Sequence, residues 1–140
     1  MLNPALVRIL GYASIDELLA VRPQDLYLDP SARTALVRDI RACGFVSNRE
    51  LVMVRKDKSQ ILVSCTAQGK NDAQGALGWI DGAVDDITER KKMESALRES
   101  EERYRMFLDS SNDIAFLKGD DFRYLMVNRA FERFLNRPAA

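Results

Sequence analysis

The chain has 140 residues, of which 46% are hydrophobic and 30% charged, so it is long enough to form one or two globular modules with a buried core. Lysine plus arginine and aspartate plus glutamate both number 21, and this balance leaves no basic field for a nucleic-acid backbone. No apolar run of about 18 residues and no secretory signal occur in the sequence. We therefore expect a cytoplasmic fragment that contacts neither nucleic acid nor membrane.

The residue types that most often carry catalysis are scarce. Histidine is absent, which removes the commonest general base and the usual proximal ligand of haem. Cys43 and Cys65 are too few for a disulfide framework, a CxxC redox pair or a zinc site, and we interpret both as buried thiols. Because no nucleophile–base pair and no phosphate-binding glycine loop appears, we expect no enzymatic activity, no metal and no cofactor in these residues.

One short segment occurs twice. Residues 3–11 align without gaps with residues 128–136, at a constant offset of 125, and four of the nine positions are identical. The two copies begin with asparagine, a good helix N-cap, and they end in Gly11 and Asn136, which tolerate a left-handed C-cap. The sequence therefore predicts the same short helix near both ends of the chain.

Helix signals precede strand signals in the first half of the chain. Ser14, with Glu17 three residues later, predicts a second short helix, and Asp29-Pro30 opens a longer one that Gly44 ends. Three runs rich in β-branched and small residues follow, and we predict antiparallel strands at residues 49–55, 60–67 and 76–85, with a longer turn at residues 69–75. Helices followed by an antiparallel meander indicate the α+β class.

The next segment, residues 88–108, is predicted to be one long helix with Asp86 as its cap. Its apolar side alternates spacings of four and three residues, which is the narrow seam of a short coiled coil rather than the broad face of a core helix. The seam consists of Met93, Leu97, Ser100, Tyr104 and Phe107. We expect a solvated linker helix.

Beyond the linker the chain begins a second module. Two short strands, residues 113–118 and 122–127, are predicted to form a hairpin that leads into the second copy of the repeated helix. The domain organisation is therefore a first module over residues 1–87, a linker helix over 88–108, and the opening of a second module over 109–140.

Several motifs resemble those of the PAS domain family of bacterial sensors. The letters KDKS at residues 56–59 resemble the family's KDGS hairpin, DITERK at 86–91 resembles the end of its closing strand, and SEERYR at 100–105 resembles the lead-in to a further PAS unit. The resemblance implies a five-stranded antiparallel sheet with short helices on one face. Lys58 stands where the family usually has glycine, so we expect a positive φ at a cost there.

The resemblance also implies that an opening hairpin precedes the first Asn-capped helix and pairs with the closing strand, and this hairpin is absent. The closing strand would then keep a free edge that recruits a partner strand. Because the linker helix is about 30 Å long, we predict a two-fold homodimer in which each hairpin of residues 113–127 adds to the other chain's closing strand, with the linker helices side by side. The alternative is nonspecific dimerisation over that edge.

The resemblance implies that the chain is a sensory or regulatory module of a larger bacterial signal-transduction protein. This parent protein is expected to be a histidine kinase or a cyclic-dinucleotide enzyme. The module couples the state of a ligand or partner to an output domain through the linker helix, and a ligand-free dimerisation scaffold is the alternative. The family's flavin-binding cysteine motif is absent, so no cofactor is implied.

Two sets of residues are candidates for this role. A small-molecule ligand would contact the inner face of the sheet, although simple core packing explains the same alternation. The residues that alternation assigns to this face are Ile61, Val63, Cys65, Ile80 and Val84. The resemblance assigns signal transmission to the junction residues Asp86, Thr88 and Arg90, for which helix capping is the alternative.

Overall fold

The computed structural model describes residues 3–73 and 75–135 of the chain. The chain divides into two compact units, Met1–Lys91 and Lys92–Ala140, and the boundary lies within one long helix. The first unit contains α1 (Pro4–Leu10), α2 (Ile15–Leu19), the 3-10 helix η1 (Pro23–Leu26), α3 (Pro30–Cys43) and the strands β1 (Phe45–Val54), β2 (Gln60–Asn71) and β3 (Leu77–Asp86). The long helix α4 (Thr88–Ser110) is followed by β4 (Phe116–Lys118), β5 (Tyr124–Val127) and α5 (Arg129–Leu135).

The predicted helix caps of the first unit are confirmed. The side chain of Asn3 accepts a hydrogen bond from the Ala5 amide at 2.9 Å, and the Ser14 hydroxyl accepts one from the Glu17 amide at 3.1 Å. Gly44 ends α3 in the left-handed conformation with φ 81°. Asn136, the predicted cap of the second repeated helix, lies outside the described residues.

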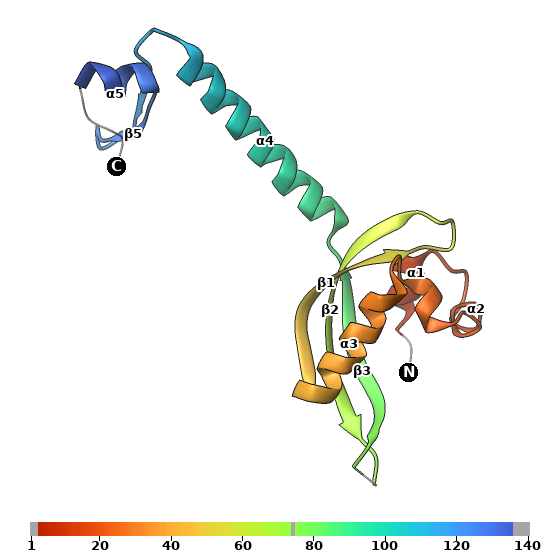
Figure 1. Cartoon of the computed structure of the whole chain (residues 1–140). Coiled ribbons are helices and arrows are strands. Elements are labelled where there is room, and N and C mark those ends of the chain that lie inside the picture. The colour runs from red at the N-terminus through yellow and green to blue at the C-terminus, as the bar shows by residue number, and fades with distance from the viewer. Residues whose placement is uncertain (1–2, 74, 136–140) are drawn as a thin grey trace. The chain divides into compact units, whose positions relative to one another are not determined.

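The first unit contains an antiparallel sheet in the order β1-β2-β3, and helices α1 to α3 contribute side chains to the core on one of its faces (Figure 1). The β1–β2 turn places Lys58 at φ 69°, the positive value that the sequence predicts. The Asp57 carboxylate accepts hydrogen bonds from the Ser59 amide at 2.9 Å and from its hydroxyl at 2.6 Å. These bonds stabilise the turn despite the unfavourable backbone angle at Lys58.

Two strands of the first unit are clearly longer than predicted, and the hairpin strands β4 and β5 are shorter than the predicted 113–118 and 122–127. β1 begins at Phe45 rather than at residue 49, and β2 continues to Asn71, into the segment predicted to be a turn. Glycine at position 69 explains the longer β2, because a Cβ there would lie 2.6 Å from Leu77 and 2.8 Å from Ile40. A side chain at this position would force the Leu77 and Ile40 side chains to shift, so Gly69 favours close packing within the strand rather than a turn.

The core of the first unit joins the inner face of the sheet to the helices. Its buried members are Val7, Leu10, Leu18, Leu36, Ile40, Leu51, Met53, Ile61, Val63, Cys65 and Ala67. The prediction that both cysteines are buried is correct for Cys65 and wrong for Cys43, which is exposed at the last residue of α3, where the chain turns into β1.

The second unit contains a small hairpin and a helix that share an aromatic cluster. The ring of Phe131 on α5 lies 6.0 Å from that of Phe116 on β4 and 5.2 Å from that of Tyr124 on β5. The Lys118 ammonium lies 4.5 Å from the centre of the Tyr124 ring. Phe116 and Tyr124 nevertheless remain 53% and 52% exposed, so this unit buries little of its apolar surface.

The described strands form a three-stranded sheet and a separate two-stranded sheet, not the single five-stranded sheet that the family resemblance implies. The reason is the chain order, because the 23-residue α4 stands between β3 and β4. One edge of β3 and one edge of β4 have no strand partner among the described residues. In the part of the chain that the structure describes, no helix has both the length and the apolar character of a membrane span.

The close approach at Gly82 gives a test of the sheet packing. A Cβ at this position would lie 2.8 Å from the Thr66 carbonyl oxygen and 2.9 Å from the Ala67 Cβ, so we expect Gly82→Ala to lower the free energy of unfolding by about 1–3 kcal/mol. Urea unfolding followed by the fluorescence of Trp79, the single tryptophan, measures this change. The control, Ala83→Val at the exposed next position, should change stability by less than about 0.5 kcal/mol. Equal losses in the two variants would contradict the packing argument.

Candidate functional site at the two ends of the long helix

The junction between β3 and α4 is organised by the carboxylate of Asp86. One of its oxygens accepts a hydrogen bond from the Thr88 amide at 3.0 Å, which satisfies a backbone group in the first turn of α4. The other oxygen accepts one from the Arg55 guanidinium at 2.8 Å. The Thr88 hydroxyl in turn accepts a hydrogen bond from the Leu62 amide of β2 at 2.9 Å. The first turn of α4 is thereby attached to β2 and to the end of the β1–β2 hairpin.

Arg55 extends this network to the beginning of the chain. Its Nε donates to the carbonyl oxygen of Ile9 in α1 at 2.8 Å, while a terminal nitrogen of the same guanidinium binds Asp86. The amide of Lys56 donates to the Leu10 carbonyl oxygen at 3.0 Å. The C-terminal carbonyls of α1 are therefore connected to the start of α4 through one side chain.

The electrostatics of the junction favour the charged form of Asp86. Partial burial by itself would raise the pKa of Asp86, but the hydrogen bonds from the Thr88 hydroxyl and amide, together with the Arg55 charge, outweigh it and hold that pKa below its ordinary value. The side chains of Arg55 and Asp86 are 35% and 25% exposed, so the pair is only partly screened by solvent.

Two further contacts hold the first turn of α4. Ile87 is 1% exposed, and its amide donates to the Leu62 carbonyl oxygen at 2.9 Å. The Lys91 ammonium lies 2.6 Å from a carboxylate oxygen of Glu50 on β1. Of the predicted junction residues, the structure brings Asp86 and Thr88 together, whereas Arg90 is exposed and has no hydrogen bond or ion pair with a described residue.

The predicted ligand-contacting residues lie on the inner face of the sheet but are not equally buried. Ile61, Val63 and Cys65 are buried in the core, where burial raises the pKa of the Cys65 thiol. Val84, the strand partner of Cys65, is half-buried against the same core. Ile80 is 41% exposed towards the other end of β3. Within the described residues, no group of cysteine, aspartate or glutamate side chains is arranged to hold a metal ion.

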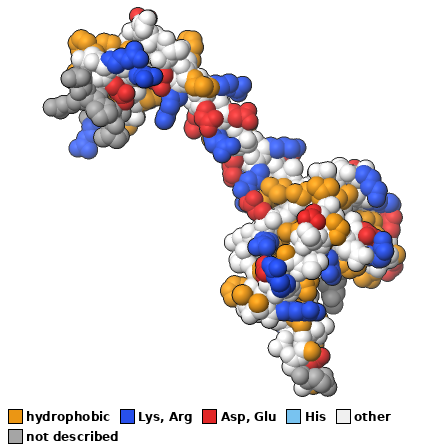
Figure 2. Space-filling model, in the orientation of Figure 1, with side chains coloured by type: hydrophobic (Ala, Val, Ile, Leu, Met, Phe, Trp, Pro, Cys, Tyr) orange, Lys and Arg blue, Asp and Glu red, His pale blue; other side chains and the backbone are white. Residues whose placement is uncertain are grey.

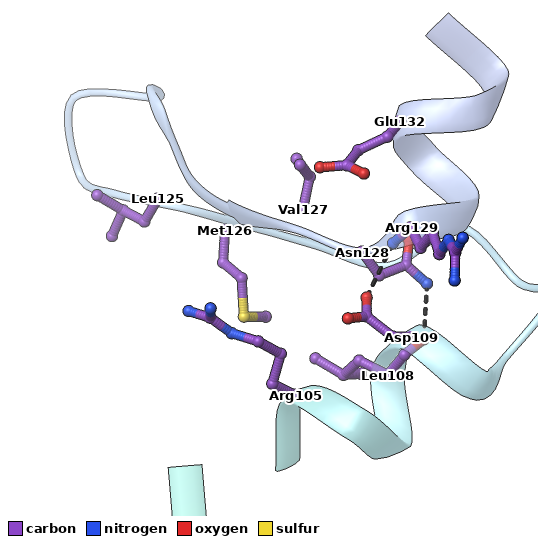
Figure 3. A pocket seen from close by; sticks show the side chains of 9 residues that line it. All are labelled: Arg105, Leu108, Asp109, Leu125, Met126, Val127, Asn128, Arg129 and Glu132. Atoms are coloured by element: carbon purple, nitrogen blue, oxygen red, sulfur yellow. Dashed lines mark hydrogen bonds between the residues drawn. The ribbon is translucent and has the colours of Figure 1, made fainter. Parts of the chain in front are cut away.

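The other end of α4 borders a pocket of about 370 Å³ in the second unit, between the last turns of α4, β5 and the start of α5 (Figure 3). Arg105 and Leu108 line it from α4, and Met126 lines it from β5. The pocket carries charges of both signs, because Asp109, Arg129 and Glu132 also line it.

Asn128 and Asp109 connect the elements around this pocket, as the dashed lines of Figure 3 show. The Asn128 amide group donates to the carbonyl oxygen of Leu108 at 2.9 Å, and the Asp109 carboxylate accepts a hydrogen bond from the Arg129 amide at 3.0 Å. The sequence predicts Asn128 only as an N-cap. The contact with α4 has no local signal, since Leu108 precedes Asn128 by 20 positions.

Two protein-family models match the chain, one over each unit. A family model described as a PAS domain matches residues 1–89, and a second PAS domain model matches residues 102–140. No curated protein matches the chain.

Two solved structures show the same fold. One is a sensory box histidine kinase/response regulator from Burkholderia thailandensis E264, which is 24% identical with a TM-score of 0.57 over 74% of this chain and 79% of that one. The other is an RNA-binding light-oxygen-voltage receptor, which is 24% identical with a TM-score of 0.53 over 75% of this chain and 30% of that chain. The chain thus spans less than a third of the second relative. With a family model on each unit and a shared fold, the chain belongs to the PAS domain family.

Proposed function

We propose that the chain is a sensory or regulatory module of a bacterial signal-transduction protein, in which the first unit biases an output domain of the parent through α4. The observation that supports this most directly is the junction, where Asp86 receives hydrogen bonds from both Arg55 and Thr88. Any change in the first unit that moves α1 or the β1–β2 hairpin changes the contacts that hold the first turn of α4. We further propose that these 140 residues are not catalytic and that the enzyme, a histidine kinase or a cyclic-dinucleotide enzyme, is another part of the parent.

The input in this proposal is a small molecule or a protein partner that acts on the inner face of the sheet. Val84 is half-buried there opposite Cys65, and Ile80 is 41% exposed opposite Gly69, while Ile61 and Val63 on the same face are buried. A ligand that favours one packing of β3 over another would shift the equilibrium between two positions of the junction by its difference in affinity. The alternative function is a ligand-free scaffold, which the exposed apolar seam of α4 favours because association alone would bury it.

We propose that two copies associate through the α4 seam. Met93, Leu97, Tyr104 and Phe107 are 58–72% exposed, although they repeat at the spacing of a coiled coil. Charged side chains of both signs lie along the face of α4 that Figure 2 shows, which suits a helix solvated outside its seam. A second copy is the natural occupant of the seam, because each chain brings the same apolar stripe.

Exchange of hairpins is a second contact for the same dimer. The free edges of β3 and β4 would pair if the hairpin of one chain joined the sheet of the other. However, α5 directly follows β5 and is the repeat copy of α1. An exchanged hairpin would therefore bring α5 to the place where Val7 and Leu10 of α1 are already buried. For this reason we propose the seam as the main contact and strand exchange as the secondary one.

The ion pair at the junction predicts a pH dependence. Asp86→Asn keeps an acceptor for the Thr88 amide but loses the charge opposite Arg55, so we expect unfolding of the first unit to become easier by about 1–2 kcal/mol at pH 7. The native pKa of Asp86 lies below its unfolded value, so its stabilisation is complete above the unfolded value of about 4 and is lost as the pH falls through the lower native value. The difference between wild type and variant should therefore shrink as the pH falls below about 4.

Urea titrations of both proteins, followed by Trp79 fluorescence across this pH range, measure the difference. Asp85→Asn, at the exposed neighbouring position of β3, is the matched control and should show the smaller loss at pH 7. A pH-independent difference for Asp86→Asn would mean that its charge does not stabilise the junction.

The seam predicts a dimer with twice the mass of 15.9 kDa in light scattering at micromolar concentration. Replacing Leu97 and Phe107 together by glutamate should give a monomer, since it puts two charges into the apolar stripe. Met106→Glu is the control, because Met106 is 63% exposed on α4 but lies off the seam. A monomeric wild-type protein, or equal dissociation in the control, would rule out the seam as the contact.

Sensing and scaffolding differ in their response to small molecules. A metabolite that binds the first unit at about 100 times its Kd should stabilise it by about 2.7 kcal/mol and raise its melting temperature by several degrees. Ile80→Gln on the inner face should reduce this increase, whereas Trp79→Gln, the exposed neighbour on the outer face, should not. A dimer that binds no metabolite in a broad screen would favour the scaffold instead.

A further inference from the structure

We propose that Asn128 is the positioning residue that holds the last turn of α4 to the start of α5 within the second unit, a role separate from its function as the N-cap of α5. This inference gives the output end of the proposed signalling route, and in that sense it rests on the proposed function. The contacts that carry it lie entirely within the second unit and are independent of any ligand.

Asn128 is 1% exposed and is the one buried polar side chain among the described residues. Its four side-chain hydrogen bonds divide into two kinds. The oxygen accepts from the amides of Ala115 at 2.9 Å and Phe131 at 3.1 Å, which serves β4 and α5. The nitrogen donates to the carbonyl oxygens of Leu108 at 2.9 Å and Asp113 at 2.8 Å. The full capacity of the amide to accept twice and donate twice is therefore used.

The side-chain nitrogen of Asn128 donates a hydrogen bond to the last turn of α4. The last four carbonyls of a helix have no partner within the helix, and Leu108 lies in the final turn of α4. The Leu108 carbonyl oxygen accepts a hydrogen bond from the Ser111 amide at 3.3 Å, and the Asn128 nitrogen donates a second, shorter one at 2.9 Å. On the opposite side of the contact, Asp109 of α4 accepts from the Arg129 amide at 3.0 Å. The neighbouring residues Leu108 and Asp109 of α4 thus accept hydrogen bonds from Asn128 and Arg129 at the start of α5.

The repeated segment shows that capping alone does not require this nitrogen. Asn3 occupies the position in α1 that Asn128 occupies in α5, and its oxygen accepts from the Ala5 amide at 2.9 Å. Asn3 is exposed, and its nitrogen donates to none of the residues that the structure describes. The same residue type therefore serves as a cap in one copy, and as a cap with an attachment to a helix end in the other.

Asn128→Asp separates the two roles. Aspartate is as good an N-cap as asparagine, so the bonds to the Ala115 and Phe131 amides remain available. The two donors are lost, and a carboxylate oxygen then faces the Leu108 and Asp113 carbonyl oxygens, which repel it. Asn3→Asp is the matched control, because in that copy only the oxygen is used.

Hydrogen exchange of the full 140-residue chain, measured residue by residue with NMR, tests the inference. We expect Asn128→Asp to speed amide exchange in the last turn of α4, residues 106–110, on the order of tenfold, while β1–β3 keep their rates. Asn3→Asp should leave the last turn of α4 unchanged. Unchanged exchange at residues 106–110 in Asn128→Asp would overturn the inference.

A second variant excludes a general loosening of the unit. Phe131→Ala removes one ring of the aromatic cluster on α5 and leaves the Asn128 nitrogen untouched. We expect it to speed exchange in β4, β5 and α5 without affecting residues 106–110. If Phe131→Ala exposes the end of α4 as much as Asn128→Asp does, the end of α4 depends on the packing of the whole unit and the inference fails. The proposed sensory function is judged separately, by the metabolite screen.

Discussion

The contact between Arg55 and Asp86 is the interaction on which the transmission proposal depends. One guanidinium binds the Ile9 carbonyl oxygen of α1 and the Asp86 carboxylate, and the same carboxylate binds the Thr88 amide of α4. Partial exposure of both side chains matters here. A fully buried pair would carry a large desolvation penalty, and a fully exposed one would be screened, whereas this pair is partly desolvated and partly screened.

The contacts at the two ends of α4 differ in kind. This difference fits the proposed transmission from one end of the helix to the other. A charged pair and the buried Ile87 hold its first turn, while its last turn accepts one hydrogen bond from the Asn128 side-chain amide and one, at the Asp109 carboxylate, from the Arg129 backbone amide. Between them the helix is solvated, and its stability comes from its own backbone hydrogen bonds and from pairs such as Arg98 with Glu102. The contacts that α4 makes with other elements among the described residues are therefore concentrated at its ends.

Most of the elements could be predicted from the sequence because their signals are local. The caps at Asn3 and Ser14 act over two or three residues, and the positive φ of Lys58 follows from its place in a hairpin turn. The site was harder to predict, because Arg55 and Asp86 are 31 positions apart. The ion pair of Lys91 with Glu50 on β1, which no local pattern indicates, is a second example.

The free edge of β3 shows how sequence and fold together limit association. An unpaired strand is a template for aggregation, and natural proteins protect such strands with charge. β3 carries Asp81 and Asp85 on its outer face, so a second β3 would meet like charges, whereas the hairpin strand β4 ends in Lys118. The like charges therefore disfavour pairing between two β3 strands at this edge. A strand that carries a basic residue, such as β4, can still pair there. The proposed seam dimer does not use this edge, so in that dimer the edge would stay available for such a strand.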